Sequence, residues 1–91
     1  MKAFAQFLID TQEEMKSHNV EILLPTTSHV KLPDGMECNG YFADKPNLKF
    51  ACGCGKDIDL WAPIYIHEYC HFTQWRDGIP EWTNLTINGL Y

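Results

Sequence analysis

The chain has 91 residues, of which 45% are hydrophobic and 13% aromatic, a folded composition that suits one domain over residues 1–91. The net charge of −5 and the scattered basic residues exclude a typical nucleic-acid-binding surface, and no run approaches the ~20 apolar residues of a membrane span. Asp10 and the acidic residues after it interrupt a start that is typical of a signal peptide. We therefore expect a cytoplasmic protein with no membrane or nucleic-acid partner, whose oligomeric state the sequence leaves open.

The first half of the chain predicts one helix followed by short strands. Residues 2–18 form an amphipathic helix with an apolar stripe made of Phe4, Phe7, Leu8, Thr11 and Met15. Apolar residues then alternate at 20, 22 and 24, which predicts a strand, and the alternation resumes at Val30 and Leu32. The sequence Pro33-Asp34-Gly35 is a strong turn signal.

The second half predicts a hairpin and a longer helix. The hairpin runs through residues 39–42, turns at 44–47 and returns along 48–52, with Phe50 and Cys52 on one side. Asp57 or Asp59 is the expected N-cap of the helix, Pro63 is tolerable only in its first turn, and the helix ends near Asp77. The expected fold is α+β: an N-terminal helix, a small three- to four-stranded mostly antiparallel sheet, and a buried helix.

The second helix contains His67-Glu68-Tyr69-Cys70-His71, a complete H-E-x-x-H motif. Two histidines four residues apart lie on one face of a helix, so both imidazoles can reach one metal ion. Glu68 lies between them in projection, where its carboxylate can take a proton from water on the metal without being a ligand. The pattern predicts Zn²⁺ bound by His67 and His71, with Glu68 as the general base.

A second interpretation needs no metal. His67 and His71 are then core or cleft histidines held by ordinary hydrogen bonds, with Glu68 as their ion-pair partner. Apolar residues surround the motif on nearly every side of the helix, which indicates a buried helix. Buried imidazoles and a buried carboxylate are costly without a compensating partner, and this favours the metal.

The segment from Trp61 to Trp75, with a hairpin directly before it, resembles the zincin superfamily of metallopeptidases in the minimal form carried by phages and mobile elements. The resemblance implies a minimal zincin-like domain with zinc on His67 and His71, Glu68 as catalytic base, and a peptide or protein substrate along an edge strand. Residues 48–52 are the expected edge strand, to which an extended substrate would add. Alternatively, they are an ordinary strand edge blunted by Lys49.

A catalytic zinc site needs a third protein ligand, and the sequence offers only weak candidates. Asp77 has the spacing of some metzincins, but Gln74 replaces the glycine that turns the chain there, so the continuing helix carries Asp77 out of reach. Glu81 follows too closely to return to the metal. The remaining possibilities are His29, Cys52, Cys54, a ligand from a partner, or a ligand from sequence present only in relatives.

The four cysteines have separate interpretations. Cys52 and Cys54 form a C-x-C pair that could hold a second, structural metal together with Cys38, although common zinc fingers use other spacings. Cys70 is expected to be a small core residue. The leading functional hypothesis is a zinc-dependent metallopeptidase, a hydrolase. The alternatives are a non-catalytic zinc-binding or protein-interaction module with a peptidase-like fold, and a small structural protein without metal.

Overall fold

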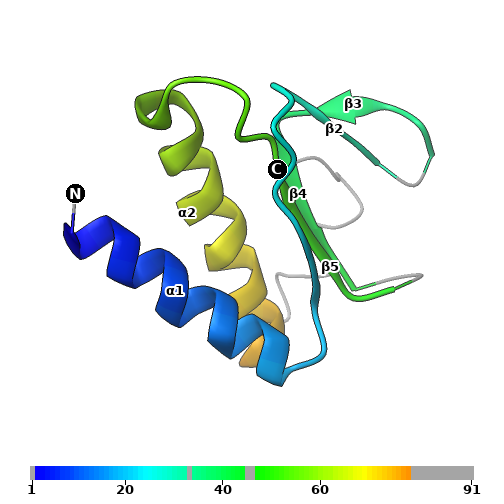
Figure 1. The fold of residues 1–91 in the computed structure, drawn as a ribbon. Coiled ribbons are helices and arrows are strands. Elements are labelled where there is room, and N and C mark those ends of the chain that lie inside the picture. Colours follow the sequence, from blue (N-terminus) through cyan, green and yellow to red (C-terminus); the bar gives the residue numbers. More distant parts are fainter. Residues whose placement is uncertain (1, 33, 45–46, 79–91) are drawn as a thin grey trace.

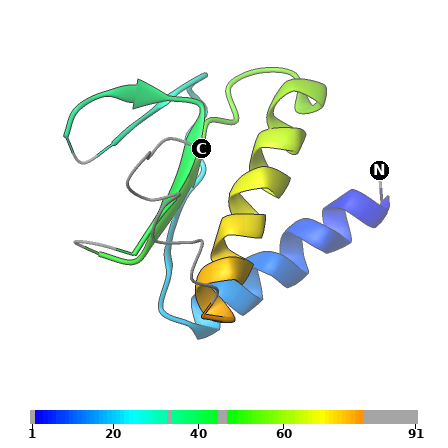
Figure 2. The same cartoon turned by 180° about the vertical axis from the view of Figure 1, so that it is seen from behind.

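The computed structural model describes residues 2–32, 34–44 and 47–78. Its elements are α1 (Lys2–Ser17), β1 (Glu21–Leu23), β2 (Val30–Lys31), β3 (Glu37–Cys38), β4 (Gly40–Ala43), β5 (Lys49–Cys52) and α2 (Ile58–Arg76). The fold is α+β, as expected, and both helices lie on the same side of the sheet (Figures 1 and 2). In the described part of the chain, neither helix is long and apolar enough to cross a membrane.

The main sheet has three strands in the order β1-β5-β4, so β5 lies in its centre. β4 pairs with β5 in antiparallel register, with Phe42 opposite Phe50, which confirms the predicted hairpin. β1 pairs with β5 in parallel, with Ile22 opposite Phe50. The expectation that residues 48–52 form an edge strand is therefore wrong. Because both sides of β5 are already paired, no peptide can add to it, and the outer strands of this sheet are β1 and β4.

β2 and β3 form a separate two-stranded antiparallel hairpin. β2 falls where the sequence predicts a strand, and the backbone N–H of Met36 donates to Asp34 Oδ1 in the turn. Gly35 adopts a φ of 92°, which L side chains rarely adopt. β3 was not predicted because two residues are too few for an alternating pattern, yet it leads directly into β4.

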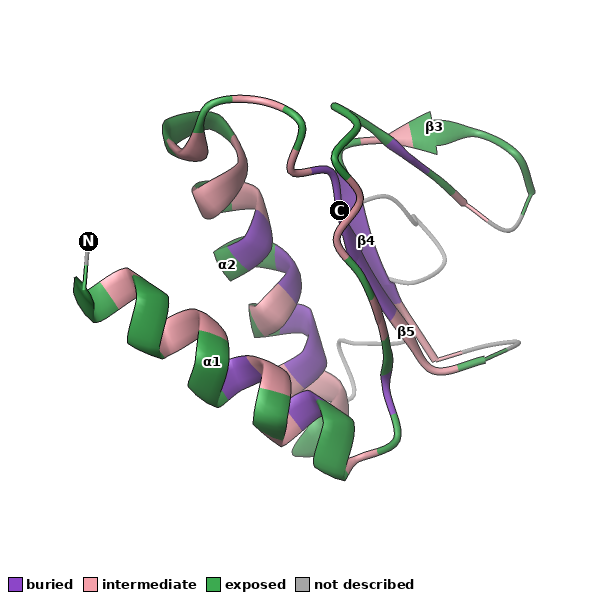
Figure 3. Ribbon diagram, viewed as in Figure 1, coloured by how far each residue is buried: buried purple, intermediate pink, exposed green. Residues whose placement is uncertain are grey.

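Buried residues are concentrated in β4, β5 and α2 (Figure 3), and strand alternation places those of the strands on the two faces of the sheet. Phe42, Phe50 and Cys52 face the helices and join the core that includes Met15, Tyr65 and Phe72. Tyr41 and Ala51 face the other way and pack with Val30 of the small hairpin. Fully burying one large apolar side chain stabilises a fold by about 1.5–3 kcal/mol, so the helix-facing cluster holds the two layers together.

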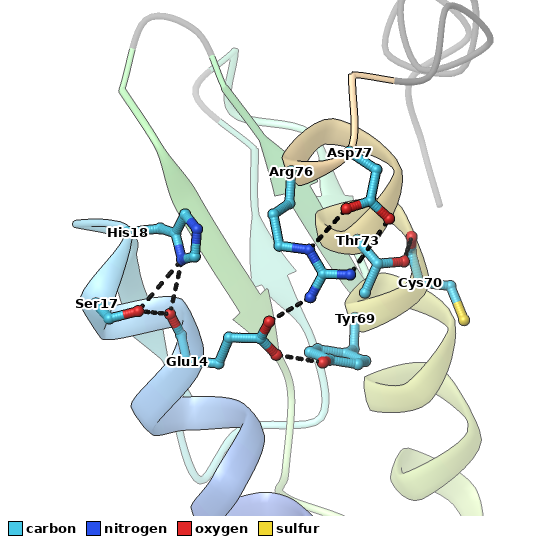
Figure 4. Close-up of polar contacts among 8 residues, drawn as sticks. All are labelled: Glu14, Ser17, His18, Tyr69, Cys70, Thr73, Arg76 and Asp77. Carbon is cyan, nitrogen blue, oxygen red and sulfur yellow. Dashed lines mark hydrogen bonds and ion pairs between the residues drawn. The ribbon is translucent and has the colours of Figure 1, made fainter.

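Polar contacts fix α1 against α2. The hydroxyl groups of Thr11 and Tyr65 lie 2.7 Å apart in the core. Nearer the end of α1, the Tyr69 hydroxyl donates to Glu14 Oε1 at 2.5 Å, and Arg76 forms an ion pair with the same carboxylate. Figure 4 shows Tyr69 and Arg76 pointing from α2 toward Glu14. The predicted stripe of α1 is confirmed, because Thr11 and Met15 are its buried residues.

α2 begins after Asp57 and ends at Arg76, close to the predicted limits. Pro63 is its sixth residue, so the expectation that proline would lie in the first turn is wrong; the residue is exposed, where water can solvate the carbonyl group that loses its N–H partner. The expectation of a helix buried on nearly every side is also wrong. Ile66 is 43% exposed, because two layers can cover only part of a helix. Cys70 is also exposed, so the expectation that it is a small core residue is wrong.

Candidate metal centre

The two histidines of the motif turn their rings toward each other. His67 Nε2 and His71 Nε2 are hydrogen-bonded at 3.1 Å, and the ring planes are perpendicular. This hydrogen bond also agrees with the interpretation that needs no metal. Two nitrogens bound to one tetrahedral zinc at 2.0–2.1 Å lie about 3.3 Å apart, so this separation is nearly that of a ligand pair. The helical spacing thus brings the two imidazole nitrogens together, as the sequence predicts. The bound metal ion stays a prediction.

Gln74 holds the ring of His71 in a defined tautomer. His71 Nδ1 lies 2.9 Å from Gln74 Oε1, a carbonyl oxygen that can only accept, so the proton is on Nδ1 and His71 Nε2 accepts from His67 Nε2 in the metal-free protein. Metal-bound histidines are commonly oriented by such a contact on the other nitrogen. The sequence showed Gln74 only as a residue that continues the helix. Gln74 lies three residues after His71, a spacing at which side chains on a helix are neighbours. That spacing is the signal that would have identified Gln74 as a partner of His71.

The protonation of His67 also suits metal binding. The pKa of His67 is lowered, first because desolvation disfavours the charged ring and second because His71 is adjacent. The lowered pKa favours the neutral imidazole, which is the form that binds metals. His67 is exposed and His71 is only 7% exposed, which places the shared point of the two rings at the edge of the core.

Glu68 is 1% exposed, and its Oε1 atom has no hydrogen-bond partner among the described residues. The backbone N–H of Phe42 donates to the carboxylate, but burial dominates and raises the pKa of Glu68 to about 8. A buried polar atom without a partner costs about 1–3 kcal/mol. Such an atom beside two converging imidazoles is therefore a strong candidate for a functional group.

The pairing of β4 explains why its backbone meets Glu68. Asn39 O accepts from Gly53 N at 3.0 Å, and hydrogen-bonded pairs alternate with non-bonded pairs along an antiparallel ladder. Gly40 and Phe42 therefore each belong to a non-bonded pair with β5. Their backbone N–H and C=O groups point away from β5. The outer edge of β4 is thus the edge that reaches the motif.

Gly40 allows this close approach of strand and helix. A Cβ atom there would lie 2.9 Å from Ile64 Cγ2 and 3.4 Å from Glu68 Cγ, so a side chain would push β4 off α2. A pocket of ≈400 Å³ opens beside this contact. Its walls are residues 38–40 on one side and Pro63, Ile64, His67 and Glu68 on the other. The sequence did not single out Gly40, and it considered Cys38 only for a separate metal.

The proposed third ligands lie away from the histidines or outside the described residues. Asp77 is exposed and paired with Arg76, whose Nε lies 3.0 Å from Asp77 Oδ1. Glu81 lies outside the described residues. His29 lines a different groove, beside β1. Across residues 2–32, 34–44 and 47–78, no three His, Cys, Asp or Glu side chains are placed to hold a metal ion.

The thiols of Cys38, Cys52 and Cys54 do not converge on one point. Each is directed to its own carbonyl oxygen, on Gly40, Trp61 and Cys52 respectively. Burial raises the pKa of Cys52 to about 12, so this thiol stays protonated. The hypothesis of a structural metal on these three cysteines therefore has no support in the arrangement of the described residues.

No protein-family model matches the chain, and neither does any curated protein or solved structure.

Proposed function

We propose that the protein is a zinc-dependent metallopeptidase of the zincin type, which hydrolyses a peptide bond with Glu68 as general base. The observation that carries the proposal is the 3.1 Å separation of His67 Nε2 and His71 Nε2 on the helix that also buries Glu68. The donor set fits the ion, because imidazole is a common zinc ligand. Glu68 Oε1, which has no hydrogen-bond partner within the described part of the chain, fits a nearby positive charge.

The roles follow from the positions of the side chains. His67 and His71 would hold zinc, which acidifies water to near neutrality and acts as a Lewis acid toward a carbonyl oxygen. Gln74 keeps the proton of His71 on Nδ1. Glu68 lines the pocket beside His67, where it accepts the proton of the attacking water and passes it to the leaving amine.

The role of Glu68 as a base depends on the metal, because the metal affects the charge of the carboxyl group. In the protein alone its pKa of about 8 keeps most of the carboxyl group protonated at neutral pH. A cation within a few ångströms favours the charged form of a carboxyl group. Glu68 therefore becomes a base chiefly in the metal-loaded protein.

Metal analysis tests the site first. Untagged protein, stripped with chelator and titrated with zinc, should bind the ion and gain about 2.7 kcal/mol of unfolding free energy at 100 times the dissociation constant. The double variant His67→Ala/His71→Ala should bind none. The matched control is His29→Ala, an exposed histidine away from α2, and it should behave as wild type. Equal zinc binding by the double variant would remove the basis of the proposal.

Hydrolysis is tested with a diverse peptide mixture analysed by mass spectrometry. Zinc-loaded wild type should cut peptides that the stripped protein leaves intact. Glu68→Gln should lower the rate roughly 10²- to 10⁴-fold, the usual contribution of a general base, with its zinc content unchanged. Glu13→Gln, an exposed carboxylate on α1, is the control. Full activity in Glu68→Gln would show that the assigned base is wrong.

A non-catalytic zinc-binding module is the second candidate function. It is favoured by the absence of a third converging ligand among the described residues and by the protonated state of Glu68. Such a module would bind zinc through the same histidines but cut no peptide in the mixture. The two candidates therefore share the metal experiment and separate in the hydrolysis experiment.

A further inference from the structure

The two histidines of the motif are half of a zinc ligand set. Zinc in proteins is almost always tetrahedral, and closed sites bind it with four protein side chains. His67 and His71 supply two nitrogens that lie 3.1 Å apart. Among residues 2–32, 34–44 and 47–78, no third His, Cys, Asp or Glu is placed to join them. A second copy of the chain would bring an identical pair of imidazoles, and a symmetric pair of copies would supply four.

The exposed side of α2 has the spacing of a surface that packs against another helix. Residues seven apart on an α-helix differ by only about 20° in direction, and residues three apart lie on neighbouring rows. His67 lies on one row with Leu60 before it and Gln74 after it, and Pro63 and Cys70 form the next row. These rows have the a and d spacing through which paired helices pack. The histidine pair therefore lies in the middle of a surface that a second helix can cover.

This surface of α2, made of Leu60, Pro63, His67, Cys70 and Gln74, is open to solvent and free of acidic residues. Leu60 is 59% exposed, and Pro63, His67 and Cys70 are exposed as well. None of the five is acidic, although the chain has 12 acidic residues and a net charge of −5. In a twofold pair each surface meets its own copy, so acidic residues there would repel each other. The surface is therefore suited to a second copy of this chain.

We infer that zinc joins two copies of this chain across this surface of α2, with His67 and His71 of each copy as its four ligands. The inference rests on the proposed metal site and adds a second state of it. Because four imidazoles fill a tetrahedral ion, the paired state has no open position for water and holds zinc without hydrolysis. Zinc replaces the hydrogen bond between the rings, and the His67 proton moves from Nε2 to Nδ1, so that both Nε2 atoms present lone pairs.

Sedimentation equilibrium measures the pairing without an activity assay. Stripped, untagged protein should have the mass of one chain, 10.5 kDa, and zinc added at one ion per two chains should double it. His67→Ala removes two of the four ligands and should abolish the doubling. His29→Ala, at an exposed histidine away from α2, is the control and should pair as wild type does.

A charge placed on the surface tests the contact between the helices separately from the ligands. Leu60→Glu adds a carboxylate to each copy at an exposed position and leaves the histidine pair unchanged. It should weaken zinc-dependent pairing by at least about tenfold, since like charges brought together across an interface repel. Ile9→Glu, the same change at a residue of α1 that is 52% exposed, is the control and should pair as wild type does.

The outcomes separate this inference from the proposed function. Zinc bound at one ion per chain with no change in mass would overturn the pairing and leave the histidine site standing. No zinc binding at all would overturn both proposals. A doubled mass that persists in His67→Ala, or equal pairing of Leu60→Glu and wild type, would also overturn the inference. The mass and zinc content of the wild type decide even if a variant fails to fold.

Discussion

The side of α2 that contacts α1 and the side that contacts β4 differ in how their polar groups are hydrogen-bonded. Toward α1, the hydroxyl groups of Tyr65 and Tyr69 each have a partner, on Thr11 and Glu14. Toward β4, Glu68 is buried with one oxygen lacking a hydrogen-bond partner in the described residues. Native proteins satisfy nearly all buried polar groups, and exceptions need an explanation. The α1 side is therefore interpreted as structural, and the β4 side as the part of the helix arranged for a ligand.

The strongest test removes the core that both sides share. Phe50 is fully buried, with its ring 5.0 Å from that of Tyr65. Phe50→Ala should lower the unfolding free energy by about 3–5 kcal/mol through lost burial and a residual cavity, measured by urea denaturation. Ile66→Ala, at a residue that is 43% exposed, is the control and should change it little. A small effect of Phe50→Ala would mean that the layers are held by other contacts.

In the metal-free protein, Glu68 on the β4 side of α2 should make the free energy of unfolding depend on pH. Because the pKa of Glu68 rises from 4.5 to about 8 on folding, its contribution is fully present below pH 4.5 and is lost as pH rises through 8. Between pH 5 and pH 9, the free energy of unfolding should therefore fall on the order of 4 kcal/mol further in wild type than in Glu68→Gln. Denaturation at both pH values measures this difference. Parallel curves for the two proteins would show that the carboxylate is solvated in solution.

A smaller effect is expected from the residue that orients His71. Gln74→Leu removes the acceptor for His71 Nδ1–H and should weaken zinc binding roughly 10- to 100-fold, with little change in fold. Competition with a chromophoric chelator measures the affinity. Thr73→Ala is the neighbouring control, since that hydroxyl bonds only the Cys70 carbonyl in the described structure. Unchanged affinity in Gln74→Leu would remove Gln74 from the site.

The smallest effect belongs to the α1 side. The pKa of Glu14 is lowered, first by the hydrogen bond from Tyr69 and then by Arg76, so its stabilisation is present above pH 4.5 and is lost as pH falls through the lowered value. The carboxylate is 32% exposed, so Glu14→Gln should cost less than about 1 kcal/mol at pH 7. The two proteins should converge once the pH falls below the lowered pKa of Glu14. A gap that persists there would point to lost packing instead of lost charge.

The local pattern predicted most elements within a residue or two. The stripe of α1, the hairpin of β4 and β5, and the helix that ends before Gly78 all follow from period, turn residues and caps. The spacing of His67 and His71 also anticipated their convergence. The central position of β5 was not predictable, because its parallel pairing with β1 joins segments separated by the small hairpin.

The sequence by itself determined the helical frame of the motif, because the geometry of an α-helix places residues four apart on one face. Only the tertiary structure decided that Glu68 would be buried at the outer edge of β4 and that Cys38 would share its pocket. Those relations depend on the closeness of strand and helix at Gly40. Contacts between distant segments arise from packing, which no local periodicity encodes.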